Sequence, residues 1–207
     1  MGFNKKTVRD IPVDGQTVLV RAGYDIPVDN GFIVDDLWIR DSLPTINYLL
    51  ERGCKVIVVS HYGTPTMRDI DHSLEPAAAR LAQLLHRDIR FVSEVIGDRV
   101  LQAIKKSPNN SVVVLENLRF HPGEEADDAE FAQNLVRSTG ARYHIQDNFA
   151  ITHKKYASTD AITAFLPSVA GLALEKDYLT ILKVMQLTGA KNDLDLPGVE
   201  VLLDVGR

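Results

Sequence analysis

Residues 112–125 read VVVLENLRFHPGEE. It begins with an apolar run, becomes polar at Glu116, and carries Arg119 just before the dipeptide Pro122-Gly123. A short apolar run bounded by turn residues is typical of a buried parallel strand. In open α/β sheets, ligands bind outside the carboxyl ends of such strands. The stretch alone is therefore compatible with an anion site at Arg119 and, equally, with a surface arginine in a loop.

The rest of the chain alternates apolar runs of strand length with amphipathic runs of helix length. Strands are expected at residues 17–22, 55–60, 88–92, 112–116, 143–146 and 169–172. Helices are expected at residues 35–51, 97–106, 127–138 and 174–187, with another that Ser73 caps and that has Pro76 in its first turn. The alternation predicts a single-domain α/β fold, a doubly wound, Rossmann-like parallel sheet of about six strands with helices on both faces.

Composition excludes some classes of partner. The chain has 207 residues, of which 45% are hydrophobic and 25% charged, and its net charge is -5. Nucleic acids and anionic membranes are bound by basic surfaces, so neither is an expected partner. No apolar run approaches the roughly 18 residues of a membrane span, and residues 1–9 lack the apolar core of a signal peptide. The single cysteine, Cys54, is expected to be buried, and this usage is typical of a cytoplasmic protein.

Parallel strands place their exit loops at one edge of the sheet. The loops after the first, second, fourth and fifth strands carry the polar residues Asp25, His61, Arg119, His153, Lys154 and Lys155. We expect these side chains to line one partly positive cleft that can hold an anion such as phosphate or sulfate. The acidic residues Glu124, Glu125, Asp127 and Asp128 are interpreted as a solvated helix N-terminus, and His144 as a surface or loop residue.

Ordered segments along the chain carry a family resemblance. They are VLVR at 18–21, LPTI at 43–46, Ser60-His61, LENLRF at 115–120, PGEE at 122–125, AST at 157–159 and LPSVAG at 166–171. Over roughly residues 1–180 the chain resembles the N-terminal half of phosphoglycerate kinase. The resemblance implies a two-domain α/β hinge enzyme, in which the N-terminal half holds 3-phosphoglycerate and the C-terminal half holds Mg-ATP.

The end of the chain departs from that pattern. Residues 1–187 are expected to form the phosphoglycerate-kinase-like domain, and residues 188–195 a short linker that stands in place of the nucleotide domain. Residues 196–207 resemble the extreme C-terminus of the family, which packs back on the N-terminal half; a natural truncation with an unrelated tail is the alternative. ATP and Mg²⁺ are expected only if a separate nucleotide-binding domain supplies their site, and no other cofactor or metal is expected.

The strand-end cleft departs from the family pattern as well. The family has Asp-Phe/Tyr-Asn where this chain has Gly23-Tyr24-Asp25. At four further positions, the chain lacks an arginine or a histidine that the resemblance implies. Trp38, Thr64 and Lys154 stand in place of arginines, and Tyr156 in place of a histidine.

These changes affect anion binding. Guanidinium groups grip phosphates and carboxylates by paired hydrogen bonds, and each lost charged contact costs roughly 1.5–3 kcal/mol. The aromatic rings of Trp38, Tyr62 and Tyr156 either form walls for a flatter ligand or plug the cleft. The expected function is a repurposed or engineered domain that binds a small anionic or aromatic ligand without complete kinase activity.

Two other functions stay open. One is an enzyme in which Asp25 with His61 or His153 acts as a general base, or Lys154 or Lys155 forms a Schiff base. The other is one half of a split phosphoglycerate kinase. No catalytic residue is assigned; the candidates are Asp25, His61, His153 and Lys154. The expected ligand-binding residues are Asp25, Trp38, His61, Tyr62, Thr64, Arg119, His153, Lys154, Lys155 and Tyr156.

Overall fold

The computed structural model describes residue 3, residues 5–29 and residues 32–188. Six strands form one parallel sheet in the order β5-β6-β4-β1-β7-β8. Their bounds are β1 (Thr17–Arg21), β4 (Lys55–Val59), β5 (Arg90–Val92), β6 (Ser111–Leu115), β7 (Tyr143–Gln146) and β8 (Ser168–Ala170). The strand order reverses at β1, whose neighbours are β4 and β7. Such a reversal opens a crevice outside the carboxyl ends of the central strands.

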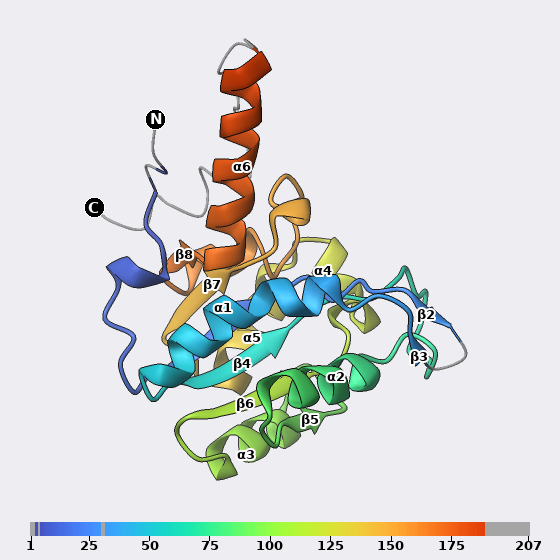
Figure 1. Ribbon diagram of the computed structural model, residues 1–207. Coiled ribbons are helices and arrows are strands. Elements are labelled where there is room, and N and C mark those ends of the chain that lie inside the picture. The colour runs from blue at the N-terminus through green and yellow to red at the C-terminus, as the bar shows by residue number, and fades with distance from the viewer. Residues whose placement is uncertain (1–2, 4, 30–31, 189–207) are drawn as a thin grey trace.

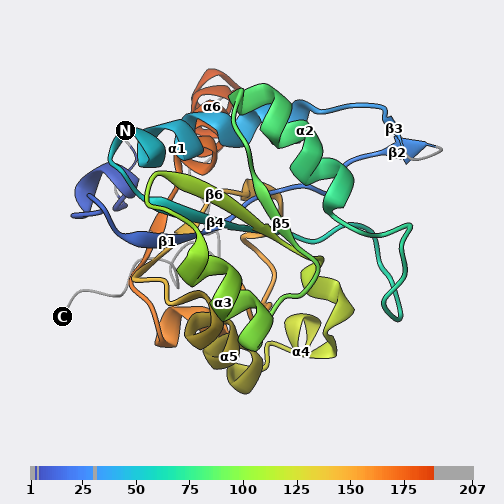
Figure 2. The same ribbon diagram turned by 90° about the horizontal axis from the view of Figure 1, so that it is seen from below.

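Helices cover both faces of the sheet (Figures 1 and 2). On one face lie α1 (Leu37–Glu51), α2 (Glu75–Leu85) and α6 (Leu172–Thr188), and α1 contacts the other two. On the other face lie α3 (Asp98–Lys106), α4 (Pro122–Glu125) and α5 (Ala129–Thr139), and α5 contacts the other two. The predicted doubly wound, Rossmann-like sheet is therefore confirmed.

The central strands are apolar on both sides, because each face of the sheet meets a helical layer. Val18 and Val20 of β1 pack into the core under α1 and α2. Leu19, between them, belongs to the core under α3 and α5. Alternate residues of a strand point to opposite faces, so one continuous apolar run supplies two cores.

Several elements differ from the sequence expectation. A two-stranded antiparallel sheet joins β2 (Val28–Asp29) to β3 (Phe32–Ile33). The helix expected from residue 127 begins at Ala129, because the Asp128 carboxylate accepts hydrogen bonds from the backbone N–H groups of Glu130 and Phe131. A separate short helix, α4, precedes it. Ser73 lies before α2 and accepts a hydrogen bond from the N–H of Glu75, although Leu74 is the N-cap residue.

Four short 3₁₀ helices connect the main elements: η1 (Val8–Asp10), η2 (Leu118–Phe120), η3 (Phe149–Ile151) and η4 (Ala161–Ala164). Cys54 is buried, as expected, and its thiol contacts the carbonyl oxygen of Val13 at 3.0 Å. No helix within the described residues is long and apolar enough to span a bilayer. Of the expected linker 188–195, only Thr188, at the end of α6, is described, and the tail 196–207 lies outside the described residues.

Candidate functional site

The segments that leave β1, β4 and β6 are tied together at the switch point. The Ser60 hydroxyl accepts a hydrogen bond from the N–H of Tyr24 at 2.8 Å, and the Ser60 carbonyl accepts one from Leu118 at 3.0 Å. The Asn117 amide oxygen accepts from the N–H groups of Tyr62 and Arg119 at 3.3 and 3.0 Å. Side chains at the ends of three strands are thereby fixed relative to one another.

Arg119 lies on η2, directly after β6, and its side chain is only 10% exposed. Nη1 donates to the carbonyl oxygen of Gly63 at 2.6 Å, and Nη2 donates to the hydroxyl of Tyr156 at 3.1 Å. Nε lies 3.1 Å from a carboxylate oxygen of Glu125. An incoming oxyanion at Arg119 therefore competes with partners from the protein itself, above all with the Glu125 carboxylate.

A second arginine, Arg21, lies fully buried at the end of β1. Nε donates to the Ser158 hydroxyl at 2.8 Å, and Nη2 lies 3.8 Å from the Glu124 carboxylate. Ser158 in turn donates to Glu124 from its hydroxyl at 2.6 Å and from its N–H at 3.1 Å. Burial lowers the pKa of Arg21 to about 10, which leaves it charged at neutral pH. Arg21, Glu124 and Ser158, together with His61, form the buried arginine network.

Glu124 corrects one sequence interpretation. It is 1% exposed and belongs to the buried arginine network, not to a solvated helix N-terminus. Burial raises the pKa of its carboxyl, while Arg21 and the Ser158 hydrogen bonds act in the opposite direction. The physical reason for the error is that Pro122 begins the short helix α4, which turns Glu124 toward the end of β1.

His61 is 5% exposed, and its Nδ1 lies 2.9 Å from Nη2 of Arg21. A guanidinium can only donate, so Nδ1 is the acceptor and the ring proton is on Nε2. Nε2 lies 3.7 Å from the Asp25 carboxylate. Burial first, and then Arg21 and Arg119, lower the pKa of His61 to about 2. The imidazole is therefore neutral, which removes it from the predicted positive cluster and makes it a weak general base at pH 7.

The other expected residues on these loops are more open. The side chain of Asp25 is 47% exposed, and one of its oxygens accepts the N–H of Gly63 at 2.8 Å. Thr64 follows on the exposed surface. Tyr62 is half-buried, and its ring lies 5.5 Å from the ring of His72. The loop after β4 thus joins Asp25 and Arg119 through the backbone of Gly63.

The segment after β7 contributes Tyr156 to the site. Tyr156 contacts Arg119, whereas His153, Lys154 and Lys155 are exposed. The nearest anionic partner of Lys155 is the carboxylate of Asp160, at 3.8 Å. These three basic side chains directly precede Tyr156 in the chain, and the Arg119 contacts described above do not include them.

Trp38 lies apart from the Arg119 contacts. It lines a pocket between α1 and α6 together with Gly23 and Asn148. His144, expected at the surface, is instead fully buried on β7, where Nδ1 lies 3.1 Å from the Ser168 hydroxyl. Burial is also the main reason why its pKa is lowered to about 3.

Of the buried arginine network, His61 was expected at the site from the sequence, whereas Arg21, Glu124 and Ser158 were not. Arg21 is the polar end of an otherwise apolar strand, a signal that marks the carboxyl edge of the sheet as clearly as Arg119 does. Ser158 carried no such signal, because its contact with Arg21 spans 137 positions of the chain. As for metals, no group of three or more His, Cys, Asp or Glu side chains within the described residues is placed to hold an ion.

The fold and the site together define a class: a doubly wound α/β domain with an arginine-containing cluster at its switch point. Comparison with known proteins defines the family. The family model for phosphoglycerate kinase matches residues 8–192. The phosphoglycerate kinase of Coprothermobacter proteolyticus is 43% identical over 181 residues, which cover 86% of this chain and 46% of that protein. The phosphoglycerate kinase of Pelotomaculum thermopropionicum is 41% identical over 174 residues, which cover 84% of this chain and 44% of that protein.

Solved structures agree with the sequence matches. The crystal structure of phosphoglycerate kinase from Pyrococcus horikoshii OT3 has a TM-score of 0.77 at 27% identity, and the match covers 92% of this chain and 47% of that chain. The structure from Coxiella burnetii has a TM-score of 0.73 at 25% identity. The chain belongs to the phosphoglycerate kinase family and resembles its N-terminal half. It spans less than half the length of the curated relatives reported above.

Proposed function

We propose that this chain is the ligand-binding half of a phosphoglycerate-kinase-like protein, and that the face around Arg119 binds a small oxyanion or aromatic acid. Binding there is weaker than a phosphoglycerate site requires, and this half alone transfers no phosphoryl group. The observation that carries the proposal is the position of Arg119, a guanidinium at the switch-point edge that contacts Tyr156, which follows the exposed residues His153, Lys154 and Lys155 in the chain.

The charges around Arg119 support weak binding. Glu125 already lies against Nε, and the exposed Asp25 carboxylate adds a second negative charge near the same loop. His61 contributes no positive charge because its pKa is lowered to about 2. Lys154 and Lys155 supply attraction from the border of the face. A monoanion or a flat aromatic acid fits this balance better than a ligand that carries both a phosphate and a carboxylate.

Calorimetric titration of phosphate, benzoate and 3-phosphoglycerate tests the proposal. Arg119→Gln removes the guanidinium, and we expect it to weaken phosphate and benzoate binding by roughly tenfold or more. Arg142→Gln is the matched control, because Arg142 is exposed and lies before β7, at the opposite edge of the sheet. If Arg119→Gln leaves all three affinities unchanged, the oxyanion is not held at Arg119 and the proposal is wrong.

A split kinase is the second candidate, and the length of the match favours it: the chain covers 44–48% of the curated relatives. In that case a separate nucleotide-binding half supplies the site for ATP and Mg²⁺, because the described residues offer no metal cluster of their own. Mixing the chain with such a half, ATP, Mg²⁺ and 3-phosphoglycerate tests this directly. Phosphoryl transfer in the mixture, absent from either half alone, would replace the first proposal with the second.

A further inference from the structure

A pocket of about 200 Å³ opens between α1, α6 and the segment that follows β7. Trp38 and Phe149 contribute aromatic surface to it, and the carboxylates of Asp41, Asp147 and Asp177 also line it. The proposed function uses none of these groups. The pocket is separate from the Arg119 contacts, which involve Gly63, Tyr156 and Glu125.

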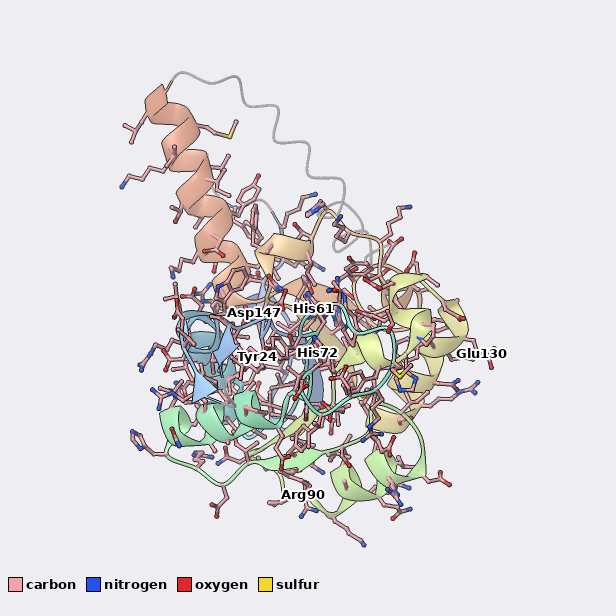
Figure 3. The ribbon with its side chains drawn as sticks, turned by 90° about the vertical axis from the view of Figure 1, so that its right-hand side faces the viewer. Tyr24, His61, His72, Arg90, Glu130 and Asp147 are labelled. Carbon is pink, nitrogen blue, oxygen red and sulfur yellow. The ribbon has the colours of Figure 1, made fainter. Side chains whose placement is uncertain are left out.

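Asp147 is the deepest of the three acidic residues and is 5% exposed. Its Oδ1 accepts hydrogen bonds from the Thr45 hydroxyl at 2.8 Å and from the N–H of Ala173 at 3.0 Å. Its Oδ2 is buried and has no hydrogen-bond partner within the described part of the chain. Figure 3 places Asp147 at the foot of α6. A buried carboxylate oxygen without a partner costs free energy, so a donor that enters the pocket and reaches Oδ2 is favoured.

The backbone holds this carboxylate in place. A Cβ atom at Gly171 would lie 2.0 Å from Oδ1 of Asp147, so only glycine allows the side chain to pack there. Gly171 also donates its N–H to the carbonyl of Gln146 at 2.7 Å, immediately before α6. The missing Cβ atom at Gly171 therefore leaves the space that the Asp147 carboxylate fills at the start of α6.

The two other carboxylates make the pocket electrostatically negative. Asp41 is paired with Lys176 at 2.9 Å, so those two charges largely cancel. Asp177 is half-buried; burial and the charge of Asp41 both raise the pKa of its carboxyl. The charge that is not balanced inside the pocket belongs to Asp147 and Asp177.

The lining of the pocket favours an organic cation over a metal ion. The described carboxylates are not grouped closely enough to coordinate an ion. Indole and phenyl faces attract ammonium groups, and the volume fits a molecule smaller than a drug. We propose that the pocket between α1 and α6 binds a small primary ammonium ion with an alkyl or aryl body. The ammonium donates a hydrogen bond to Oδ2 of Asp147, and the body packs against Trp38.

Because Asp147 can be protonated, binding of an ammonium ion should release protons. Burial raises the pKa of Asp147 to about 7; the hydrogen bonds from Thr45 and Ala173 lower it, and Asp177 adds a small increase. Asp41, which also lines the pocket, is paired with Lys176. At pH 6.5 the carboxyl is partly protonated, and a bound ammonium favours the anion. Binding therefore releases protons, which calorimetry detects as a heat that depends on the buffer.

The test titrates benzylammonium, benzyl alcohol and benzoate into the chain at pH 6.5 in two buffers that differ in ionisation enthalpy. Benzylammonium is expected to bind at least tenfold more tightly than the alcohol, with proton release, and benzoate is expected not to compete with it. Asp147→Asn keeps an acceptor for Thr45 and Ala173 but removes the charge. It should weaken benzylammonium by roughly tenfold or more and abolish the proton release.

Asp177→Asn gives an independent readout if Asp147→Asn does not fold. Asp177 lies on α6 and is only half-buried, so this variant is expected to fold and to bind benzylammonium severalfold more weakly. Asp98→Asn, on the exposed start of α3, is the matched control and leaves binding unchanged. Equal affinities for benzylammonium and benzyl alcohol, or no loss in either pocket variant, would overturn the proposal. Phosphate binding at Arg119 is measured separately, so the proposal for either site can be contradicted without the other.

Discussion

At the scale of single residues, Gly23 lies close to Asn148 and to the indole of Trp38. A Cβ atom at Gly23 would lie 2.8 Å from Nδ2 of Asn148 and 3.0 Å from Cε3 of Trp38. A side chain at position 23 would therefore clash with Asn148 and press against the indole. We expect the residues at positions 23 and 38 to be coupled by volume.

His144 gives a prediction on pH and stability. Its pKa is about 3 in the folded state, lowered by burial and Arg21, and near 6.5 when unfolded. Between these values the unfolded state binds more protons. The contribution of His144 is therefore fully present above pH 6.5 and is lost as the pH falls. His144→Leu removes it, so the slope of unfolding free energy against pH between 4.5 and 6 should fall by about 1.4 kcal/mol per pH unit.

Urea unfolding at several pH values measures that slope. His153→Leu, which changes an exposed histidine, is the control and should match the unsubstituted chain. Identical slopes for His144→Leu and the unsubstituted chain would mean that the buried imidazole accepts its proton at an ordinary pH.

At the scale of elements, the six strands were predictable because each is an apolar run bounded by turn residues. The β2–β3 pair was missed, although an Asn-Gly dipeptide at 30–31 between two short runs is a known hairpin signal. The helix α4 was missed because Pro122-Gly123 was interpreted as a turn, whereas a proline also begins helices. The position of Arg119 at the carboxyl edge of the sheet could be predicted, because parallel strands place their exit loops at one edge. The neutral state of His61 could not be predicted, because it depends on burial and on Arg21, 40 positions away.

The end of α2 gives a prediction at this scale. His86, its C-cap, has φ 52° and ψ 42°, a left-handed conformation that favours glycine. His86→Gly should stabilise the fold by about 0.5–1 kcal/mol in urea unfolding. Asp127 has a similar φ of 53°, but its carboxylate accepts the N–H of Ala161 at 3.0 Å, so Asp127→Gly should give no gain or a loss. Equal gains at both positions would contradict this account of the two turns.

At the scale of the whole molecule, the chain has the scaffold of the family, and our proposal concerns its strand-end edge. An apolar core lies on each face of the sheet. The buried arginine network links the end of β1 to Ser158, at the edge where the crevice opens. At that edge Trp38 lies beside Gly23, and the exposed Thr64 carries no charge. We therefore expect an intact framework with weak affinity for oxyanions.

Calorimetric titration of 3-phosphoglycerate into the chain and into its Thr64→Arg variant tests this expectation. Thr64 directly follows Gly63, whose carbonyl oxygen Arg119 contacts, and the variant returns a guanidinium group that the family resemblance implies there. One charged contact contributes roughly 1.5–3 kcal/mol, so the variant should bind 3-phosphoglycerate about tenfold more tightly or better, from a very weak starting affinity. Micromolar binding by the unsubstituted chain, with no gain from the arginine, would contradict the account.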